Sequence, residues 1–147
     1  MLLFRQTRSM RIANMKLELD LLREILLYVE EHGTRPYNDL ENIRIDGWSD
    51  DEITYHVVIA DEDGLLKATV EGLPDDEDPS ILHLVYSVHR LTSRGHELIG
   101  TIREPKTWNV VKTGLGKVGS VTVNAVFGVA EAYLKQKIVE YSGMDLS

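Results

Sequence analysis

Histidines and acidic residues are the side chains of this sequence that could bind a metal ion. His83 and His89 belong to one predicted strand, and at the rise of a strand they stand about 20 Å apart, too far to share an ion. The run Asp75–Asp78 lacks the spacing, central glycine and terminal glutamate of a calcium loop. His56 and His96 are separated by several predicted elements. We therefore interpret the histidines as structural or solvent-facing, and we expect no metal and no cofactor.

The residues that would support nucleophilic catalysis are missing. The sequence contains no cysteine, which excludes a thiolate nucleophile and a disulfide framework. It also lacks the Gly-x-Ser-x-Gly elbow of serine hydrolases. Residues Gly114–Gly119 are rich in glycine, but their spacing differs from that of a phosphate loop and no strand is predicted before them. We interpret this segment as a flexible hinge between helices, and we expect a non-enzymatic protein.

Acidic and basic residues are unevenly distributed along the chain, whose formal net charge is −8. Residues 17–89 carry 19 acidic and 4 basic side chains, whereas residues 1–16 and 90–140 are basic. An acidic surface repels polyanions, so any contact with nucleic acid is expected at the basic ends. The candidate residues there are Arg5, Arg8, Arg11, Arg90, Arg94, Arg103, Lys106, Lys112 and Lys117.

Hydrophobic spacing predicts the elements that carry these residues. Apolar side chains at helical spacing predict a helix over residues 16–32, and alternation predicts a short strand at Ile43–Asp46. Ser49 and Glu52 have the spacing of a capping box, in which each side chain accepts a hydrogen bond from the other residue's backbone amide. This box predicts that a helix begins at residue 50 and continues to residue 62.

Two strands and another helix are predicted to follow. Alternating residues predict strands at Leu65–Glu71 and Ile81–His89, connected by the acidic loop. The even-numbered residues of the second strand form one apolar face. Thr92 is a suitable N-cap for a helix to about Glu104, and Pro105 ends that helix because proline removes an amide donor.

The C-terminal part of the chain is predicted to be helical. Residues 106–113 favour a helix, the glycines then interrupt it, and Ser120 caps a last helix to about Tyr141. This last helix is apolar on two sides, and its small residues would let a second helix approach closely. We therefore expect a homodimer. Its interface would contain Val121, Ala125, Gly128, Val129 and Ala132.

Several short motifs occur along the chain in a fixed order. They are Met15-Lys16-Leu17, Ile53-Thr54-Tyr55-His56, Asp63-Gly64-Leu65-Leu66, Arg90-Leu91-Thr92-Ser93-Arg94-Gly95-His96-Glu97-Leu98, and Trp108 with Val111-Lys112. Together they resemble a small bacterial and phage family with no assigned function. The resemblance covers roughly residues 15–140 and implies a winged-helix-like fold and an association with prophages, without catalytic residues.

These features together predict an α+β fold. Its core is winged-helix-like, with a helix, a short strand, a helix and a two-stranded wing, and a C-terminal helical extension follows. The expected organisation is a basic N-terminal arm at residues 1–14, the core at 15–104 and the extension at 105–147. No apolar run approaches the length of a membrane span, and the N-terminus lacks the apolar region of a secretory signal. We therefore expect a cytoplasmic protein.

The helix at 50–62 would be the recognition helix of such a core. It contains no lysine or arginine, and its acidic residues would repel DNA phosphates. The first hypothesis is a regulatory winged-helix protein of bacterial or phage origin that contacts DNA through its basic ends. The alternative is an interaction module whose acidic helix and acidic wing loop bind a basic protein partner.

Overall fold

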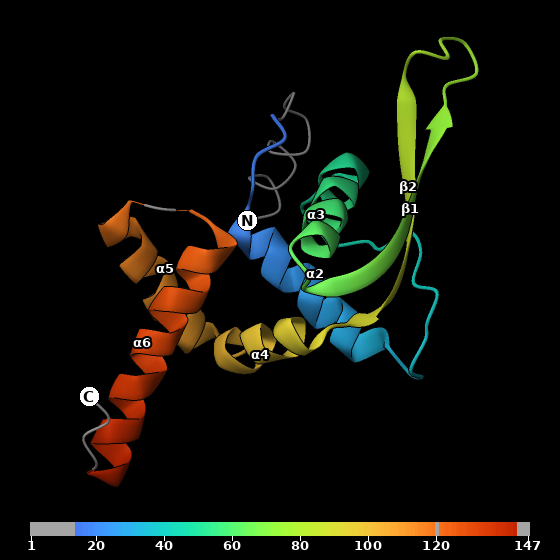
Figure 1. The fold of residues 1–147 in the computed structure, drawn as a ribbon. Coiled ribbons are helices and arrows are strands. Elements are labelled where there is room, and N and C mark those ends of the chain that lie inside the picture. The colour runs from blue at the N-terminus through green and yellow to red at the C-terminus, as the bar shows by residue number, and fades with distance from the viewer. Residues whose placement is uncertain (1–13, 120, 144–147) are drawn as a thin grey trace. The chain divides into compact units, whose positions relative to one another are not determined.

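The computed structural model describes residues 14–119 and 121–143, and it confirms an α+β fold. Five helices and one two-stranded antiparallel sheet are present in these residues (Figure 1). The chain divides into two compact units, Met1–Gly95 and His96–Ser147. The elements are α2 (Leu19–His32), α3 (Asp50–Glu62), β1 (Leu66–Pro74), β2 (Leu82–Leu91), α4 (Ser93–Ile102), α5 (Pro105–Val118) and α6 (Val123–Ser142). Of the predicted N-terminal arm, residues 1–13 lie outside the described residues.

Helices α2 and α3 form the core of the first unit together with the base of the hairpin. Both helices bury one apolar face, because their apolar side chains recur at helical spacing. The capping box is confirmed: the Glu52 amide donates to Ser49 Oγ at 3.1 Å, and the Ser49 amide donates to Glu52 Oε1 at 3.2 Å. This box satisfies two amide donors of the first turn, which is why α3 begins at residue 50.

Strands β1 and β2 form a long hairpin whose base is buried and whose outer part is exposed. Pairing runs from Leu66 opposite Leu91 to Pro74 opposite Leu82, with one irregularity between Lys67 and Ala68. Figure 1 shows the hairpin extending past α3, with its acidic connecting loop at the tip. This order of helices followed by a hairpin is compatible with a winged-helix arrangement.

The predicted strand at Ile43–Asp46 is wrong. A third strand exists only as a single bridge, in which Leu40 and Val88 exchange two hydrogen bonds of 2.9 Å. Asn42 then adopts a positive φ of 51°, a conformation that asparagine tolerates better than most residues. Its turn takes the chain out of the extended conformation, and Ile43 becomes a buried side chain of an irregular segment.

Helices α5 and α6 pack against each other in the second unit. The predicted glycine hinge is wrong, because Gly114 and Gly116 lie inside α5 and only Gly119 adopts the left-handed conformation that ends it. A β-carbon at Gly114 would lie 2.8 Å from Val129 Cγ1, so the glycine allows the two helices to approach closely. Helix α6 is capped by Thr122, which accepts from the Ala125 amide at 3.0 Å. This cap replaces the predicted Ser120, which lies outside the described residues.

Candidate protein-binding groove

The Asp-Gly-Leu-Leu and Leu-Thr-x-x-Gly motifs contact each other and have a structural role. The Thr92 hydroxyl donates to the carbonyl of Gly64 and accepts from the Gly95 amide at 3.0 Å, while the Thr92 amide donates to the Leu65 carbonyl at 3.1 Å. The Leu65 carbonyl also packs on Gly95, where a β-carbon would lie 1.9 Å from the oxygen. These contacts join the end of α3 to the start of α4. The motifs therefore have a structural role, because they fix the junction between these two helices.

An open groove of about 880 Å³ lies between the first half of α3 and strand β2. All of its lining residues belong to the first unit. They are Met15, Glu41, Asn42, Ile43, Arg44, Asp50, Asp51, Thr54, Tyr55, Thr69, Glu71 and residues 81–87. We refer to this feature as the α3–β2 groove.

The charge of the α3–β2 groove is acidic. Glu41, Asp50, Asp51 and Glu71 line it, and Arg44 is the only lysine or arginine among the lining residues. Arg44 is already engaged, because its Nη1 donates to both carboxylate oxygens of Asp50 at 2.8 and 3.1 Å. A ligand in the groove would therefore meet carboxylates with one compensating cation, which favours a positively charged ligand.

Exposed apolar side chains from both faces of β2, and Ile81 just before it, line the groove. Leu82 is 61 % exposed and Leu84 is 44 % exposed, and Ile81 and Val85 are also exposed. The neighbouring strand places no side chain beside Leu84, because Leu84 pairs with Gly72. The alternation in the sequence predicted an apolar even-numbered face of β2, but it did not decide whether that face is covered. Ile81 and Val85 are apolar on the other face too, which a strand with one solvated face does not require.

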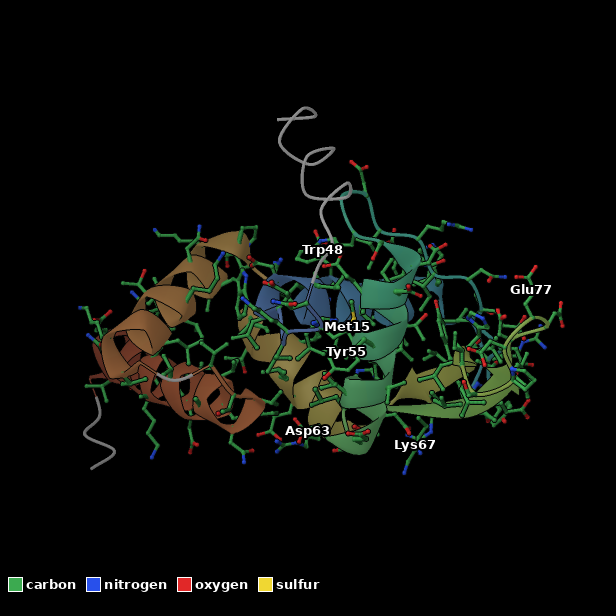
Figure 2. All side chains as sticks on the ribbon, turned by 90° about the horizontal axis from the view of Figure 1, so that it is seen from above. Met15, Trp48, Tyr55, Asp63, Lys67 and Glu77 are labelled. Atoms are coloured by element: carbon green, nitrogen blue, oxygen red, sulfur yellow. The ribbon has the colours of Figure 1, made fainter. Side chains whose placement is uncertain are left out.

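The acidic loop at the tip of the hairpin is a folded turn. Asp75 Oδ2 accepts from the amides of Glu77 and Asp78, each at 3.0 Å, and Asp78 Oδ1 accepts from the amide and hydroxyl of Ser80. His83 Nε2 lies 2.7 Å from Asp75 Oδ1, and this contact, followed by the two amide bonds, lowers the pKa of Asp75. Figure 2 shows Glu77 at this tip and Lys67 at the base of the hairpin. Two of the four acids therefore shape the loop.

Two buried histidines are held by hydrogen bonds. His56 Nε2 accepts from the Glu18 amide at 2.8 Å, so Nδ1 carries the proton and donates to the Glu52 carbonyl at 2.7 Å. Burial lowers the pKa of His56 and outweighs the backbone bond and the nearby carboxylates, which raise it. His89 Nδ1 donates to the Asn38 carbonyl at 2.8 Å, and its Nε2 contacts the Thr69 hydroxyl at 2.7 Å. Both histidines therefore serve the fold.

The basic residues proposed for nucleic acid are divided between the two units. In the first unit, Arg90 is exposed and donates to the Leu91 carbonyl, and Arg94 Nε lies 3.3 Å from the Asp63 carbonyl. In the second unit, Arg103 is exposed. These assignments stay predictions.

The three lysines of α5 lie on two sides of that helix. Lys106 and Lys117 line a second groove, of about 550 Å³, between α5 and α6. Lys112 does not line it, and its Nζ lies 5.7 Å from the centroid of the Trp108 ring. Two of the three lysines, Lys106 and Lys117, therefore line the same groove.

The predicted dimer residues differ in their surroundings. Val121 is 58 % exposed and precedes α6. Ala125 is half-buried and Gly128 is exposed. Val129 is half-buried against Gly114 of its own unit, whereas Ala132 is exposed, and both line the groove between α5 and α6. Val129 thus contacts its own chain, and the dimer itself stays a prediction.

The described part of the chain offers neither a metal-binding cluster nor a membrane-spanning helix. No group of three or more histidine, aspartate or glutamate side chains is placed there to hold a metal ion. Of the described helices, none is long and apolar enough to cross a membrane.

Comparison with known proteins places the chain in a family. A protein of Haemophilus influenzae, named only as an uncharacterised protein, is 29 % identical over 126 residues, which is 84 % of this chain and 99 % of that protein. No solved structure matches the chain significantly. The family described as hypothetical protein (DUF2513) matches residues 16–122, which include the two motifs joined through Thr92 and Gly95. This chain therefore belongs to the DUF2513 family.

Proposed function

We propose that this protein is a non-enzymatic interaction module, of a bacterium or its phage, that binds a basic and apolar segment of a partner protein in the α3–β2 groove. The observation that carries the proposal is the composition of the groove, in which exposed apolar side chains of β2 are bordered by carboxylates. Apolar contact supplies affinity, and the carboxylates select a cationic partner. The same carboxylates would repel a nucleic acid.

The geometry of α3 supports this use. Asp50, Asp51 and Tyr55 are exposed on the side of α3 that lines the groove, whereas Ile53, Val57 and the other buried residues face the core. A half-exposed tyrosine gives an apolar ring and a polar hydroxyl, a combination enriched at protein interfaces. The face that a DNA reader would use thus has the composition of a protein-binding face.

Site-specific photo-crosslinking in the native cell tests this function. A crosslinking residue at Tyr55 is expected to capture a protein whose attached segment is basic, and a crosslinking residue at His96, exposed and outside the groove, serves as the control. The double change Asp50→Lys and Asp51→Lys is expected to abolish the capture from position 55. Capture of the same proteins from both positions, or capture that survives the charge reversal, would refute the proposal.

Regulation of transcription through DNA contact is the second candidate. The order of elements is compatible with a winged helix, and Lys106 and Lys117 line the α5–α6 groove together with Asn109 and Gln136. Binding to random duplex DNA should then weaken with salt. Replacing either lysine with alanine should reduce the salt slope by about one. The change of both Asp50 and Asp51 to alanine should leave DNA binding unchanged or stronger, and no salt-dependent binding at low ionic strength would exclude this candidate.

A further inference from the structure

The two edges of strand β2 have different hydrogen-bonding states. In an antiparallel strand, the N–H and C=O of one residue point to the same side, and that side alternates from residue to residue. Immediately before β2, the Ile81 carbonyl accepts from the Asp75 amide across the hairpin at 2.9 Å. At the other end, the N–H and C=O of Val88 both bind Leu40, on the side away from β1. Between Leu82 and Val88, the even-numbered residues therefore direct their backbone groups away from β1. Beyond Val88 the register irregularity changes the alternation, and the His89 carbonyl accepts from the Asn38 amide at 3.0 Å.

Three of these residues have an open edge. Among the described residues, none forms a backbone hydrogen bond with Leu82, Leu84 or Tyr86 on the side away from β1. The chain that binds Val88 through Leu40 does not continue along this edge, because it turns at Asn42. The third strand of the sheet therefore stops after one bridge, and no other described backbone pairs with this edge. Leu82 and Leu84 are exposed, whereas Tyr86 is half-buried and its hydroxyl accepts from the Ile43 amide at 2.8 Å.

The open edge lies in the α3–β2 groove. Every residue from 81 to 87 lines the groove. Neighbouring side chains on a strand point to opposite faces, so a groove lined by a continuous run of residues must follow the edge of the strand. An exposed apolar edge is a template for a further strand.

We propose that the partner segment binds as an extended strand along the β2 edge at Leu82–Tyr86, continuing the strand that Leu40 begins. This inference rests on the proposed function and specifies its binding mode. Backbone hydrogen bonds to β2 supply affinity, and alternate side chains supply specificity. The occupant is a segment in which basic and apolar residues alternate: the apolar residues contact Leu82 and Leu84, and the basic residues meet Glu41, Asp50, Asp51 and Glu71.

Proline substitution on β2 gives a matched test. Leu84→Pro removes an N–H that faces the groove and is not used by the β1–β2 pairing, a position that an edge strand tolerates. Leu84→Ala removes the same side chain but keeps the N–H, and it is the control. The binding probe is a fluorescent synthetic peptide in which lysine and valine alternate over about six residues, long enough to span this edge. A fully N-methylated analogue keeps the charges and side chains but has no amide donors.

The expected result is that the peptide binds the wild-type protein and Leu84→Ala, and binds Leu84→Pro about tenfold more weakly than Leu84→Ala. The N-methylated analogue should bind the wild-type protein about tenfold more weakly than the parent peptide. Thermal unfolding verifies that the variants are folded. If Leu84→Pro does not fold, the analogue and Leu82→Pro, at the next outward position, decide the question.

Other outcomes separate the binding mode from the proposed function. Equal binding of Leu84→Pro and Leu84→Ala, or of the peptide and its analogue, would overturn strand addition alone. Peptide binding that does not weaken after Asp50→Lys with Asp51→Lys, or no binding to the wild-type protein, would overturn the proposed function as well. A wild-type dimer that Leu84→Pro dissociates and Leu84→Ala preserves would show that a second copy of this chain occupies the edge, which also overturns the proposal.

Discussion

A β-carbon on Gly95 would lie 1.9 Å from the carbonyl oxygen of Leu65. The backbone that follows α3 therefore touches the first turn of α4 directly, and Thr92 strengthens the same junction through its hydrogen bond with Gly64. Any side chain at residue 95 must displace backbone. The spacing of these motifs thus has a steric cause, and it can be tested by substitution.

Gly95→Ala is expected to destabilise the protein strongly, by about 3 kcal/mol or more, because the clash is with backbone and not with a flexible side chain. Gly100→Ala, in the same helix, is the control: a β-carbon there would meet no described atom within 4 Å, and alanine should stabilise the helix by about 0.5–1 kcal/mol. Urea unfolding measures the change in the free energy of unfolding for each of the two variants. Equal effects of the two substitutions would contradict the steric explanation.

Thr92→Val keeps the shape of the side chain but removes its hydroxyl, which both donates to the Gly64 carbonyl and accepts from the Gly95 amide. The free energy of unfolding should fall by about 1–2 kcal/mol. Thr92→Ser keeps the hydroxyl and should recover most of this stability. A valine variant as stable as the serine variant would show that the hydroxyl is dispensable.

Protonation of His56 should destabilise the fold. Burial lowers its pKa below the ordinary 6.5, so the unfolded chain binds the proton at a higher pH than the folded chain. Stability is therefore complete above about pH 6.5 and falls as the pH decreases from there towards the folded pKa, by at most about 1.4 kcal/mol per pH unit. The free energy of unfolding is measured from pH 7.5 to pH 5.5 for the wild type and for His56→Gln, which does not titrate. The wild-type free energy should fall more steeply with decreasing pH. Parallel curves would mean that His56 does not titrate between these states.

The hairpin tip should loosen without unfolding the protein when Asp75 is replaced. Asp75→Ala removes the acceptor of the Glu77 and Asp78 amides, so hydrogen exchange of these two amides should accelerate while the core amides stay protected. Asp76→Ala, which removes a neighbouring negative charge, is the control and should leave both rates unchanged. If both variants accelerate exchange equally, the carboxylate of Asp75 does not hold the turn.

A substitution at Ala132 tests self-association through α6 more directly than a substitution at Val129. Ala132 is exposed, so Ala132→Glu should leave a stable monomer if this face forms the predicted homodimer. Val129 packs against Gly114, and Val129→Glu should lower stability whether or not a dimer forms, because it buries a charge. Light scattering over a concentration series gives the mass, and a monomeric wild-type protein at tens of micromolar would end the dimer hypothesis.

The sequence by itself predicted the elements that are encoded locally. The Ser49–Glu52 box defined the start of α3, because a capping box needs only residues of one turn. Alternation predicted both strands of the hairpin, and Thr92 was the expected cap of α4, since its hydroxyl accepts from the Gly95 amide. The short motifs predicted a resemblance to a family with no assigned function, and the family match over residues 16–122 confirms it.

Only the tertiary structure decided which apolar faces are covered. Leu84 has the same local pattern as Val88, but Val88 is buried at the base of the hairpin and Leu84 is exposed on its arm, because burial depends on elements far away in the sequence. Gly114 belongs to a glycine-rich segment that is typical of a hinge, yet it lies inside α5 and packs against Val129. The open edge of β2 depends on the turn at Asn42, where one positive φ ends a third strand. Local patterns specify how a segment folds, whereas long-range packing determines what it leaves free to bind.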